Sequence, residues 1–357
     1  MSTLKVGIIG AGSISEAHIK GYKALDNVEL YALCDINEER AKEKAEKHGF
    51  AHVYTDYDEM LKLEDLDAVS VCTWNNGHAP ATIAALKAGK HVLCEKPTAM
   101  NAKEAAAMKE AADESGKLLM IGFVRRHGND AKILKDFIDA GDLGDIYYAK
   151  ANYIRRNGNP GGWFCDKSRS GGGPLIDLGV HVIDLVRYLA GRPKPVSVFG
   201  VTYSHLGNRE HIKLPKDYYS ADHVEGEACD VEDMAAAMVR FDNGMVLNVE
   251  VSFSLNVDKD RGIVELFGTK AGAKIDPELS IYTEKNGYLV DLIPAHKTAL
   301  SFEGLFENEM KHFIDCIQGE AVSIAPPEDG IEIMHILDAI YESAKTKREV
   351  IIRGSKA

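Results

Sequence analysis

The chain has 357 residues, of which 45% are hydrophobic and 27% charged, and its formal net charge is −13 at pH 7. This length suggests two domains or one large one, and the composition is typical of soluble globular proteins. The acidic balance argues against nonspecific binding to nucleic acid or to an anionic membrane, since both need a basic surface. The sequence has no apolar run near the roughly 20 residues of a membrane helix, and no signal peptide is recognisable before the first strand. We therefore expect a cytoplasmic protein with no nucleic-acid or membrane partner.

Six cysteines are spread along the chain without any CxxC pairing. Several lie in or beside apolar strand runs, which is typical of reduced core residues in a cytoplasmic protein. The sequence also has no HExxH motif and no third ligand at an informative spacing. We expect neither disulfides nor a bound metal. The six are Cys34, Cys72, Cys94, Cys165, Cys229 and Cys316.

The first third of the chain alternates between short strands and helices. Most of the helical patterns end at a glycine, and the intervening runs are short and apolar. This alternation is typical of a parallel, doubly wound sheet. Residues 1–124 are therefore expected to form an α/β domain. The predicted strands are 4–10, 28–34, 67–73, 91–94 and 117–124.

The pattern changes after about residue 125. Alternating strands turn at Asp242-Asn243-Gly244 and at Asn286-Gly287, which are strong hairpin signals. Further helices are predicted at 174–191 and 331–346. Residues 125–357 are thus expected to form an α+β domain with an open-faced, mostly antiparallel sheet. Because the free face of such a sheet is often covered by a second subunit, we expect a homodimer or homotetramer formed through it.

A glycine turn, "GAGSIS" at residues 10–15, follows the first strand and opens the first helix. It contains two glycines of a GxGxxG motif, with Ser15 in the third position. The second strand ends at Asp35, about 20 residues later, where an acidic side chain would accept hydrogen bonds from the adenosine ribose. Gly12 would let the backbone approach the pyrophosphate at a helix N-terminus. The turn therefore predicts dinucleotide binding, with NAD preferred over NADP because Asp35 would repel a 2′-phosphate.

Other side chains near the expected cofactor site are each open to two interpretations. Arg40 could stack on the adenine or be a solvated helix charge. Trp74 could be a core residue or a wall of the cofactor site. His78 could cap a helix that begins at Ala79, or lie near cofactor or substrate, since ligands bind at the carboxyl ends of parallel strands. The expected cofactor contacts are Gly10, Gly12, Ser13, Ile14, Asp35, Ile36, Arg40, Thr73, Trp74, Asn75, His78, Glu95 and Lys96.

The strand at 91–94 ends in Glu95-Lys96-Pro97. A lysine delivered to this edge could hydrogen-bond a substrate oxygen and stabilise charge that develops on it. The alternatives are a surface charge or a salt bridge with Glu95, although adjacent strand residues point to opposite faces. We also hypothesise that the Lys96–Pro97 bond is cis, which would fix the turn.

The second group of candidate residues is in "GGGPLIDLGVHVID", residues 171–184. Asp177 and His181 are four positions apart and share one helix face. A histidine oriented by a carboxylate is a common general base. A helix-surface ion pair or a capping aspartate would give the same spacing. The glycines before this helix allow close approach of backbone or ligand.

Together, "VGIIGAGSIS", Asp35, "CEKP" and the D-x-x-x-H of "DLGVH" resemble the glucose–fructose oxidoreductase/inositol dehydrogenase family, called Gfo/Idh/MocA. The resemblance covers essentially the whole chain. It implies a Rossmann domain followed by an open-faced domain used for oligomerisation. It also implies that His181 accepts the proton of the substrate hydroxyl, while Lys96 and Asp177 position the substrate. Ser15 and Trp74 depart from the family pattern, and both affect the cofactor edge.

Two further segments acquire a role through this resemblance. "GFVRRHG", 122–128, is similar to a segment that lines the site in inositol dehydrogenases, and residues 153–173 would be the substrate loop. Aromatic faces and multidentate donors suit a polyol, although loop packing and solvated charges are alternative roles. The expected substrate contacts are Lys96, Arg125, Arg126, Arg156, Trp163, Lys167, Asp177 and His181.

The sequence therefore predicts an NAD-dependent dehydrogenase that acts on a carbinol of a sugar, inositol or related polyol. Two alternatives share the fold. One is a glycoside hydrolase that retains NAD and uses it for transient oxidation. The other is a non-catalytic regulator that senses a sugar or a dinucleotide, although such a sensor would not need all of Lys96, Asp177 and His181.

Overall fold

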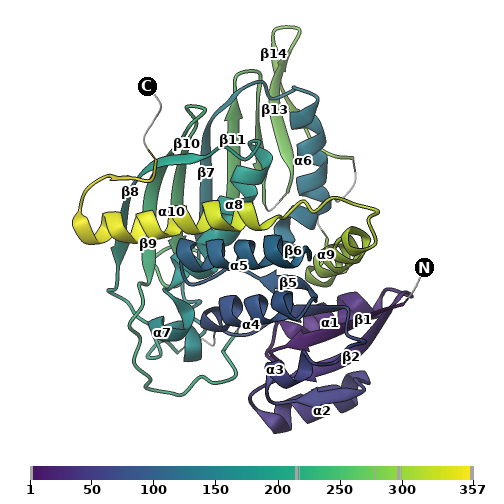
Figure 1. Ribbon diagram of the computed structural model, residues 1–357. Coiled ribbons are helices and arrows are strands. Elements are labelled where there is room, and N and C mark those ends of the chain that lie inside the picture. Colours follow the sequence, from purple (N-terminus) through teal and green to yellow (C-terminus); the bar gives the residue numbers. More distant parts are fainter. Residues whose placement is uncertain are drawn as a thin grey trace. The chain divides into compact units, whose positions relative to one another are not determined.

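The computed structural model describes residues 3–213, 216, 218–276, 278–295, 298 and 300–353. The chain forms two compact units, whose elements are labelled in Figure 1. The first unit is Met1–His127 with Leu300–Ile331, and the second is Gly128–Ala299 with Glu332–Ala357. A late segment of the chain thus packs with the first unit, where the Ile121 amide donates to the Ala325 carbonyl at 3.0 Å. The division of roles expected between 1–124 and 125–357 stays a prediction.

The first unit contains a six-stranded sheet in which every pair is parallel, as the alternation of elements predicted. The order reverses at the first strand, which pairs with β2 on one side and β4 on the other. The carboxyl ends of β1 and β4 therefore form the switch point at which such sheets bind ligands. In spatial order the strands are β3 (His52–Tyr54), β2 (Val28–Cys34), β1 (Leu4–Ile9), β4 (Ala68–Val71), β5 (His91–Glu95) and β6 (Leu119–Gly122).

The helices of the first unit follow the strands, and one comes from the late segment. That helix, α9, packs against α1. Local capping is regular: the side chain of Asn37 accepts from the Arg40 amide at 3.0 Å to begin α2, and Gly49 ends it with φ of 84°. The helices are α1 (Ser15–Lys23), α2 (Glu38–His48), α3 (Tyr57–Met60), α4 (Asn75–Lys87), α5 (Ala102–Ser115), η1 (Val124–His127) and α9 (Phe302–Ile317).

The second unit contains a nine-stranded sheet that is antiparallel except for the β7–β10 pair. Both predicted hairpins are confirmed, since β9 pairs with β10 and β13 with β14. In spatial order the strands are β14 (Tyr288–Leu292), β13 (Ser280–Lys285), β12 (Ala271–Ile275), β11 (Arg261–Gly268), β7 (Ile146–Ile154), β10 (Val246–Ser252), β9 (Met234–Phe241), β8 (Pro195–Tyr203) and β15 (Val350–Ile351).

Helices contact this sheet on one side. Figure 1 shows α8 and α10 lying across it, and the Gly200 amide of β8 donates to the Ser343 hydroxyl of α10 at 2.9 Å. Facing residues in the register, Phe199 and Met238, are 51% and 50% exposed. Because alternate residues on these strands are buried, the exposed ones define an open apolar face. The helices are α6 (Asn129–Asp139), η2 (Gly162–Cys165), α7 (Lys167–Ser170), η3 (Leu175–Gly179) and α8 (Val180–Leu189), with α10 (Pro327–Thr346) spanning both units.

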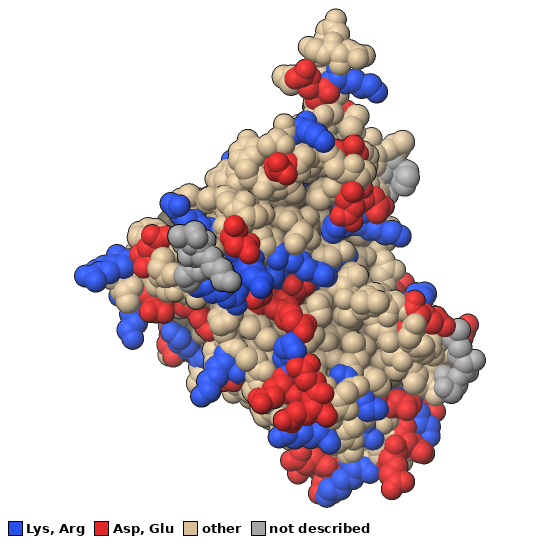
Figure 2. Space-filling model, turned by 45° about the horizontal axis from the view of Figure 1, so that its top comes forward, with Lys and Arg blue, Asp and Glu red and all other residues tan. Residues whose placement is uncertain are grey.

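The helices and the surface charges are relevant to the partners expected from the sequence. In the part of the chain that the structure describes, no helix has both the length and the apolar character needed to cross a membrane. On the face drawn in Figure 2, Lys and Arg side chains are interspersed with Asp and Glu.

The six cysteines are free thiols, but Cys229 and Cys316 are partly exposed and so are not core residues.

Candidate functional site

The turn after β1 combines a close backbone contact with an open space. Gly10 has φ of +97°, and a Cβ there would lie 2.5 Å from the Cys72 carbonyl oxygen, so only glycine fits between β1 and the end of β4. A Cβ on Gly12 would meet no described atom within 4 Å. The hydroxyl of Ser15, which replaces the third glycine, donates to the Gly12 carbonyl at 2.7 Å and closes the first turn of α1. The open backbone at this helix N-terminus, beside Ser13 and Ile14, fits a pyrophosphate.

Asp35 lies at the end of β2 beside this turn. Its buried carboxylate accepts from the Ala11 amide at 2.7 Å and from the Arg40 guanidinium at 2.6 Å. Arg40 is therefore paired with Asp35, an arrangement that neither of the two sequence interpretations anticipated. The next residue, Ile36, is 76% exposed and offers an apolar surface beside the carboxylate. Asp35 thus lies at the end of β2 where the sequence predicts a contact with the adenosine ribose, and that contact stays a prediction.

Lys44 contacts the glycine turn, and sequence reasoning missed it. From α2 its ammonium donates to the Gly12 carbonyl at 2.9 Å and to the Ser15 hydroxyl at 2.8 Å. Burial lowers the pKa of Lys44. The sequence feature that could have identified Lys44 is its position four residues after Arg40, on the same helix face. Lys44 brings a positive charge to the turn proposed to hold a pyrophosphate.

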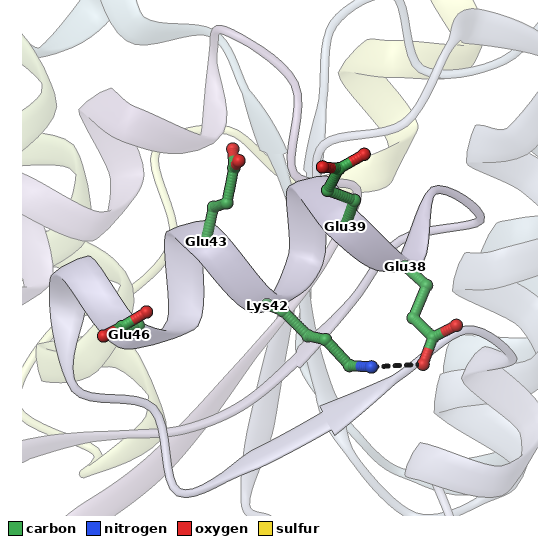
Figure 3. A pocket seen from close by; sticks show the side chains of 5 residues that line it. All are labelled: Glu38, Glu39, Lys42, Glu43 and Glu46. Carbon is green, nitrogen blue, oxygen red and sulfur yellow. Dashed lines mark ion pairs between the residues drawn. The ribbon is translucent and has the colours of Figure 1, made fainter.

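The other face of α2 is acidic and has a different character. Figure 3 shows a surface hollow lined by four glutamates and Lys42, which pairs with Glu38 at 2.6 Å. Negative charge and exposure make this hollow unsuited to phosphate. The helix thus presents Arg40 and Lys44 to the glycine turn and a solvated acidic face elsewhere. The four are Glu38, Glu39, Glu43 and Glu46.

The segment after β4 is tied to the segment after β5. His78 is buried, and its Nδ1 donates to the Pro97 carbonyl at 2.6 Å, while burial lowers its pKa. Helix α4 begins at Asn75, so His78 lies within its first turns and does not cap a helix starting at Ala79. Thr73 and Trp74 precede the helix and are half-buried. The histidine therefore fixes the proline turn to the switch point.

Glu95, expected as a cofactor contact, faces the interior of the first unit. The His18 Nε2 donates to its carboxylate at 2.7 Å, and the Lys96 amide donates to the other oxygen at 3.0 Å. Glu95 thereby fixes the backbone of Lys96 at the strand exit, where Lys96 is half-buried. The Lys96–Pro97 bond is cis, as hypothesised.

A second buried carboxyl group lies next to Glu95. Glu309 of α9 is 0% exposed, and neither of its oxygens has a hydrogen-bond partner among the described residues. One side-chain atom each from His18, Glu95 and Glu309 lie within 4.8 Å of one another. Burial, and then the Glu95 charge, raise the pKa of Glu309 well above its ordinary value, so it is a neutral carboxyl group. Sequence reasoning missed Glu309 because it is distant from Glu95 along the chain.

In the second unit, Asp177 and His181 lie on one continuous helical run. Asp177 is in η3, a π-helical segment, and His181 is in α8. Both are half-buried. Single π turns within helices are frequent at functional sites. The structure confirms that the two residues share one helical run, and their catalytic roles remain proposals.

The glycines before this run serve packing. A Cβ on Gly173 would lie 2.0 Å from the Glu232 carbonyl oxygen. The buried Glu232 carboxyl group accepts from the amides of Gly173 at 2.9 Å and Leu175 at 3.1 Å, and from the Tyr341 hydroxyl at 2.9 Å. Burial raises the pKa of Glu232. Glu232, which sequence reasoning also missed, therefore sets the start of the run that carries Asp177.

Arg155, next to the predicted Arg156, interacts electrostatically with Asp177. The Asp177 charge is among the causes that raise the pKa of Arg155, whose guanidinium also stacks on the Tyr153 ring. Arg156 is exposed and donates to the Asp258 carbonyl at 3.2 Å. Adjacent residues at a strand end point to opposite sides, so one arginine of the pair turns away.

The remaining substrate candidates differ in how they are held. The Trp163 ring packs on Phe164 with centroids 4.0 Å apart, and the Lys167 ammonium lies 5.7 Å from the centroid of the Tyr341 ring.

Arg126 is buried and pairs with Asp329 at 2.7 Å. It therefore has a packing role inside the first unit, and half-buried Arg125 is the better candidate of the two.

Comparisons with known proteins agree over both units. A family model described as an oxidoreductase family with an NAD-binding Rossmann fold, GFO_IDH_MocA, matches residues 4–123. The model of the C-terminal alpha/beta domain of that oxidoreductase family matches residues 135–352. Together they cover most of the chain.

Individual relatives match over nearly their whole length. The chain is 37% identical to D-glucoside 3-dehydrogenase of Escherichia coli over 98% of this chain and 97% of the relative. It is 28% identical to myo-inositol 2-dehydrogenase of Thermotoga maritima, over 97% and 98%. A solved structure of levoglucosan dehydrogenase in complex with NADH and levoglucosan superposes with a TM-score of 0.85 at 26% identity, over 98% of this chain and 100% of that one.

Proposed function

Because the chain belongs to the Gfo/Idh/MocA oxidoreductase family, we propose that it transfers a hydride between NAD and a carbinol of a sugar, inositol or related polyol. The family and its relatives make the chain a dehydrogenase acting on CH–OH groups. The observation that carries the finer proposal is the position of Lys96. It leaves β5 at the carboxyl edge of the same sheet whose glycine turn fits a dinucleotide.

Each residue has its own role in the proposed oxidation of the carbinol. NAD, when bound, accepts the hydride that leaves the carbinol carbon. His181 takes the hydroxyl proton, and Asp177 holds His181 or a neighbouring hydroxyl. Lys96 donates a hydrogen bond to the same substrate oxygen and stabilises the negative charge that grows there. The carbinol thus loses one hydride and one proton and becomes a carbonyl.

The cofactor preference follows from Asp35. Its buried carboxylate accepts from the Ala11 amide, which fixes it beside the glycine turn. It would accept hydrogen bonds from the ribose hydroxyls and would repel a 2′-phosphate. Arg40 does not reverse this, because its guanidinium is paired with the same carboxylate. We infer a preference for NAD, with Lys44 adding charge at the pyrophosphate.

The proposed substrate class rests on two half-buried side chains of the candidate substrate loop, Arg155 and Trp163. Arg155 offers a planar set of donors and Trp163 an aromatic face, and both suit a ring that carries several hydroxyls. The relatives are named for D-glucoside, myo-inositol and levoglucosan, all polyhydroxylated rings. We propose that the substrate is a compound of this class.

The open face of the nine-stranded sheet supports a further part of the proposal. Phe199 and Met238 face each other across β8 and β9 and are half-exposed. Exposed apolar patches of this kind mark interaction surfaces. We propose that a second copy of the chain covers this face in a homodimer or a homotetramer.

The experiment is an assay of NADH absorbance with purified protein, NAD and a panel of glucosides, inositols and anhydrosugars. A substrate-dependent rise that is lost in Lys96→Ala and in His181→Ala is the expected result. Tight NAD binding without a rise for any compound would contradict a dehydrogenase with free turnover. Cleavage of a chromogenic glycoside under those conditions would instead support the redox-neutral hydrolase.

A further inference from the structure

Two cysteines from distant parts of the second unit meet beside the candidate substrate loop. The Cys165 thiol donates to the Asn159 Oδ1 at 3.4 Å, and the same amide donates to the Cys229 sulfur at 3.6 Å. Each of the two cysteines also shifts the pKa of the other, raising that of Cys165 and lowering that of Cys229. Their backbones are adjacent, because the Asp230 amide donates to the Cys165 carbonyl at 3.0 Å. Adjacent backbones and converging side chains are what a disulfide requires.

The two sulfurs differ in access and in acidity. Cys165 is 1% exposed, whereas Cys229 is partly exposed. The interaction with Cys165 is the main cause that lowers the pKa of Cys229 to about 7. Cys229 is therefore an accessible thiolate near neutral pH, with a protonated thiol against it. This is the pairing of an attacking and a resolving thiol.

A buried cation interacts electrostatically with this pair. The Lys216 ammonium is buried and has no hydrogen-bond partner among the described residues. Burial lowers the pKa of Lys216, and the electrostatic influence of Cys165, Glu210 and Cys229 opposes that change. A positive charge at this position favours the thiolate over the thiol.

We propose that Cys165 and Cys229 form a thiol oxidation site that small-molecule disulfides, such as oxidised glutathione, convert to an intramolecular disulfide. The Cys229 thiolate attacks one glutathione sulfur, forms a mixed disulfide and releases the first glutathione thiolate. Cys165 loses its proton, attacks the Cys229 sulfur and releases the second glutathione. Two protein thiols are oxidised and one glutathione disulfide is reduced to two thiols.

The Cys165–Cys229 disulfide would link the candidate substrate loop to the segment around Cys229, and the two segments already contact each other. Asp222 accepts from the Trp163 amide at 3.2 Å, and Glu227 accepts from the Gly162 amide at 2.5 Å. The segment around Cys229 therefore supports the turn that carries Trp163. If the proposed function holds, the disulfide should change KM for the sugar more than the affinity for NAD. This consequence rests on the proposed function, whereas the oxidation itself does not.

The test is peptide mapping after equilibration of the whole chain in buffers of reduced and oxidised glutathione, with alkylation of the remaining thiols. The expected result is loss of two thiols and one linked peptide that contains Cys165 and Cys229. Cys165→Ser should stop at a single glutathione adduct on Cys229, and Cys229→Ser should keep its Cys165 thiol.

Cys316 is the matched control, because it is also partly exposed but burial raises its pKa to about 11. Cys316→Ser should leave the linked peptide unchanged. Oxidation of Cys316 as readily as Cys229, or a wild-type protein without the linked peptide, would overturn the proposal. Circular dichroism of each reduced variant establishes that it is folded. None of these readouts depends on enzymatic activity, so the failure of this proposal is distinguishable from failure of the proposed function.

Discussion

The neutral state of Glu309 predicts an unusual dependence of stability on pH. The folded chain holds this carboxyl group at 0% exposure beside Glu95, and its pKa is raised well above 4.5. In the unfolded chain the same group ionises near its ordinary value. Between these two pKa values the folded state binds one more proton than the unfolded state. Stability contributed by this proton is complete below the unfolded pKa and is lost as pH rises toward the folded pKa.

Replacing Glu309 by glutamine removes this dependence while keeping size and neutrality. One proton contributes about 1.4 kcal/mol per pH unit, so for each pH unit between the unfolded pKa and the raised folded pKa the wild type should lose about 1.4 kcal/mol more than Glu309→Gln. For a unit of this size that difference corresponds to roughly 3 to 6 °C in Tm for each pH unit. The His127 Nε2 lies 3.9 Å from a Glu309 carboxyl oxygen, but burial lowers the pKa of His127 to about 3, below the pH range that is compared.

Calorimetry of the wild type and the variant across this pH range gives the comparison. Glu307→Gln is the matched control, because Glu307 is exposed on the same helix, and its Tm should follow the wild type. The reasoning is refuted if the difference in Tm between Glu309→Gln and the wild type is the same at every pH, since Glu309 would then be ionised in the folded chain.

Four other predictions concern the proposed function. Lys96→Ala should lower kcat by about 100-fold or more while NADH still binds, and wild-type-like turnover would remove Lys96 from the mechanism. Lys44→Met should weaken NADH binding about tenfold in a fluorescence titration, whereas Lys42→Met on the acidic face of the same helix should not; equal effects would contradict the role given to Lys44. Asp35→Ser should raise the ratio of kcat/KM for NADP to that for NAD by about tenfold, because Arg40 becomes available to a 2′-phosphate, and an unchanged ratio would mean that Asp35 does not set the preference. Met238→Asp should reduce the mass measured by light scattering toward that of one chain, and an unaltered assembly would place the interface elsewhere.

The sequence predicted those features that depend on local pattern. The alternation of strands and helices gave the parallel sheet, and the Asn-Gly turns gave both hairpins. Gly10, Asp35 and Lys96 stood out as candidates because each follows directly on a strand, and their roles remain proposals. These signals lie within a few residues of the groups that they identify, so a single sequence contains them.

The features that the sequence did not predict depend on contacts between distant segments. Glu309 meets Glu95 only because α9 packs on α1, and Glu232 reaches Gly173 from another part of the second unit. The ion pair between Arg126 and Asp329 joins residues far apart in the sequence. The choice between Arg155 and Arg156 depends on which side of the chain faces Asp177. None of these pairings leaves a periodic trace in the sequence.

The most direct test of the central claim follows the hydride itself. A substrate found in the panel assay would be deuterated at its carbinol carbon and incubated with NAD and the purified chain, and the cofactor would be analysed by mass spectrometry. The account predicts reduced cofactor carrying one deuterium for each carbonyl formed. Product formation with no label in the cofactor would contradict hydride transfer from a carbinol to NAD.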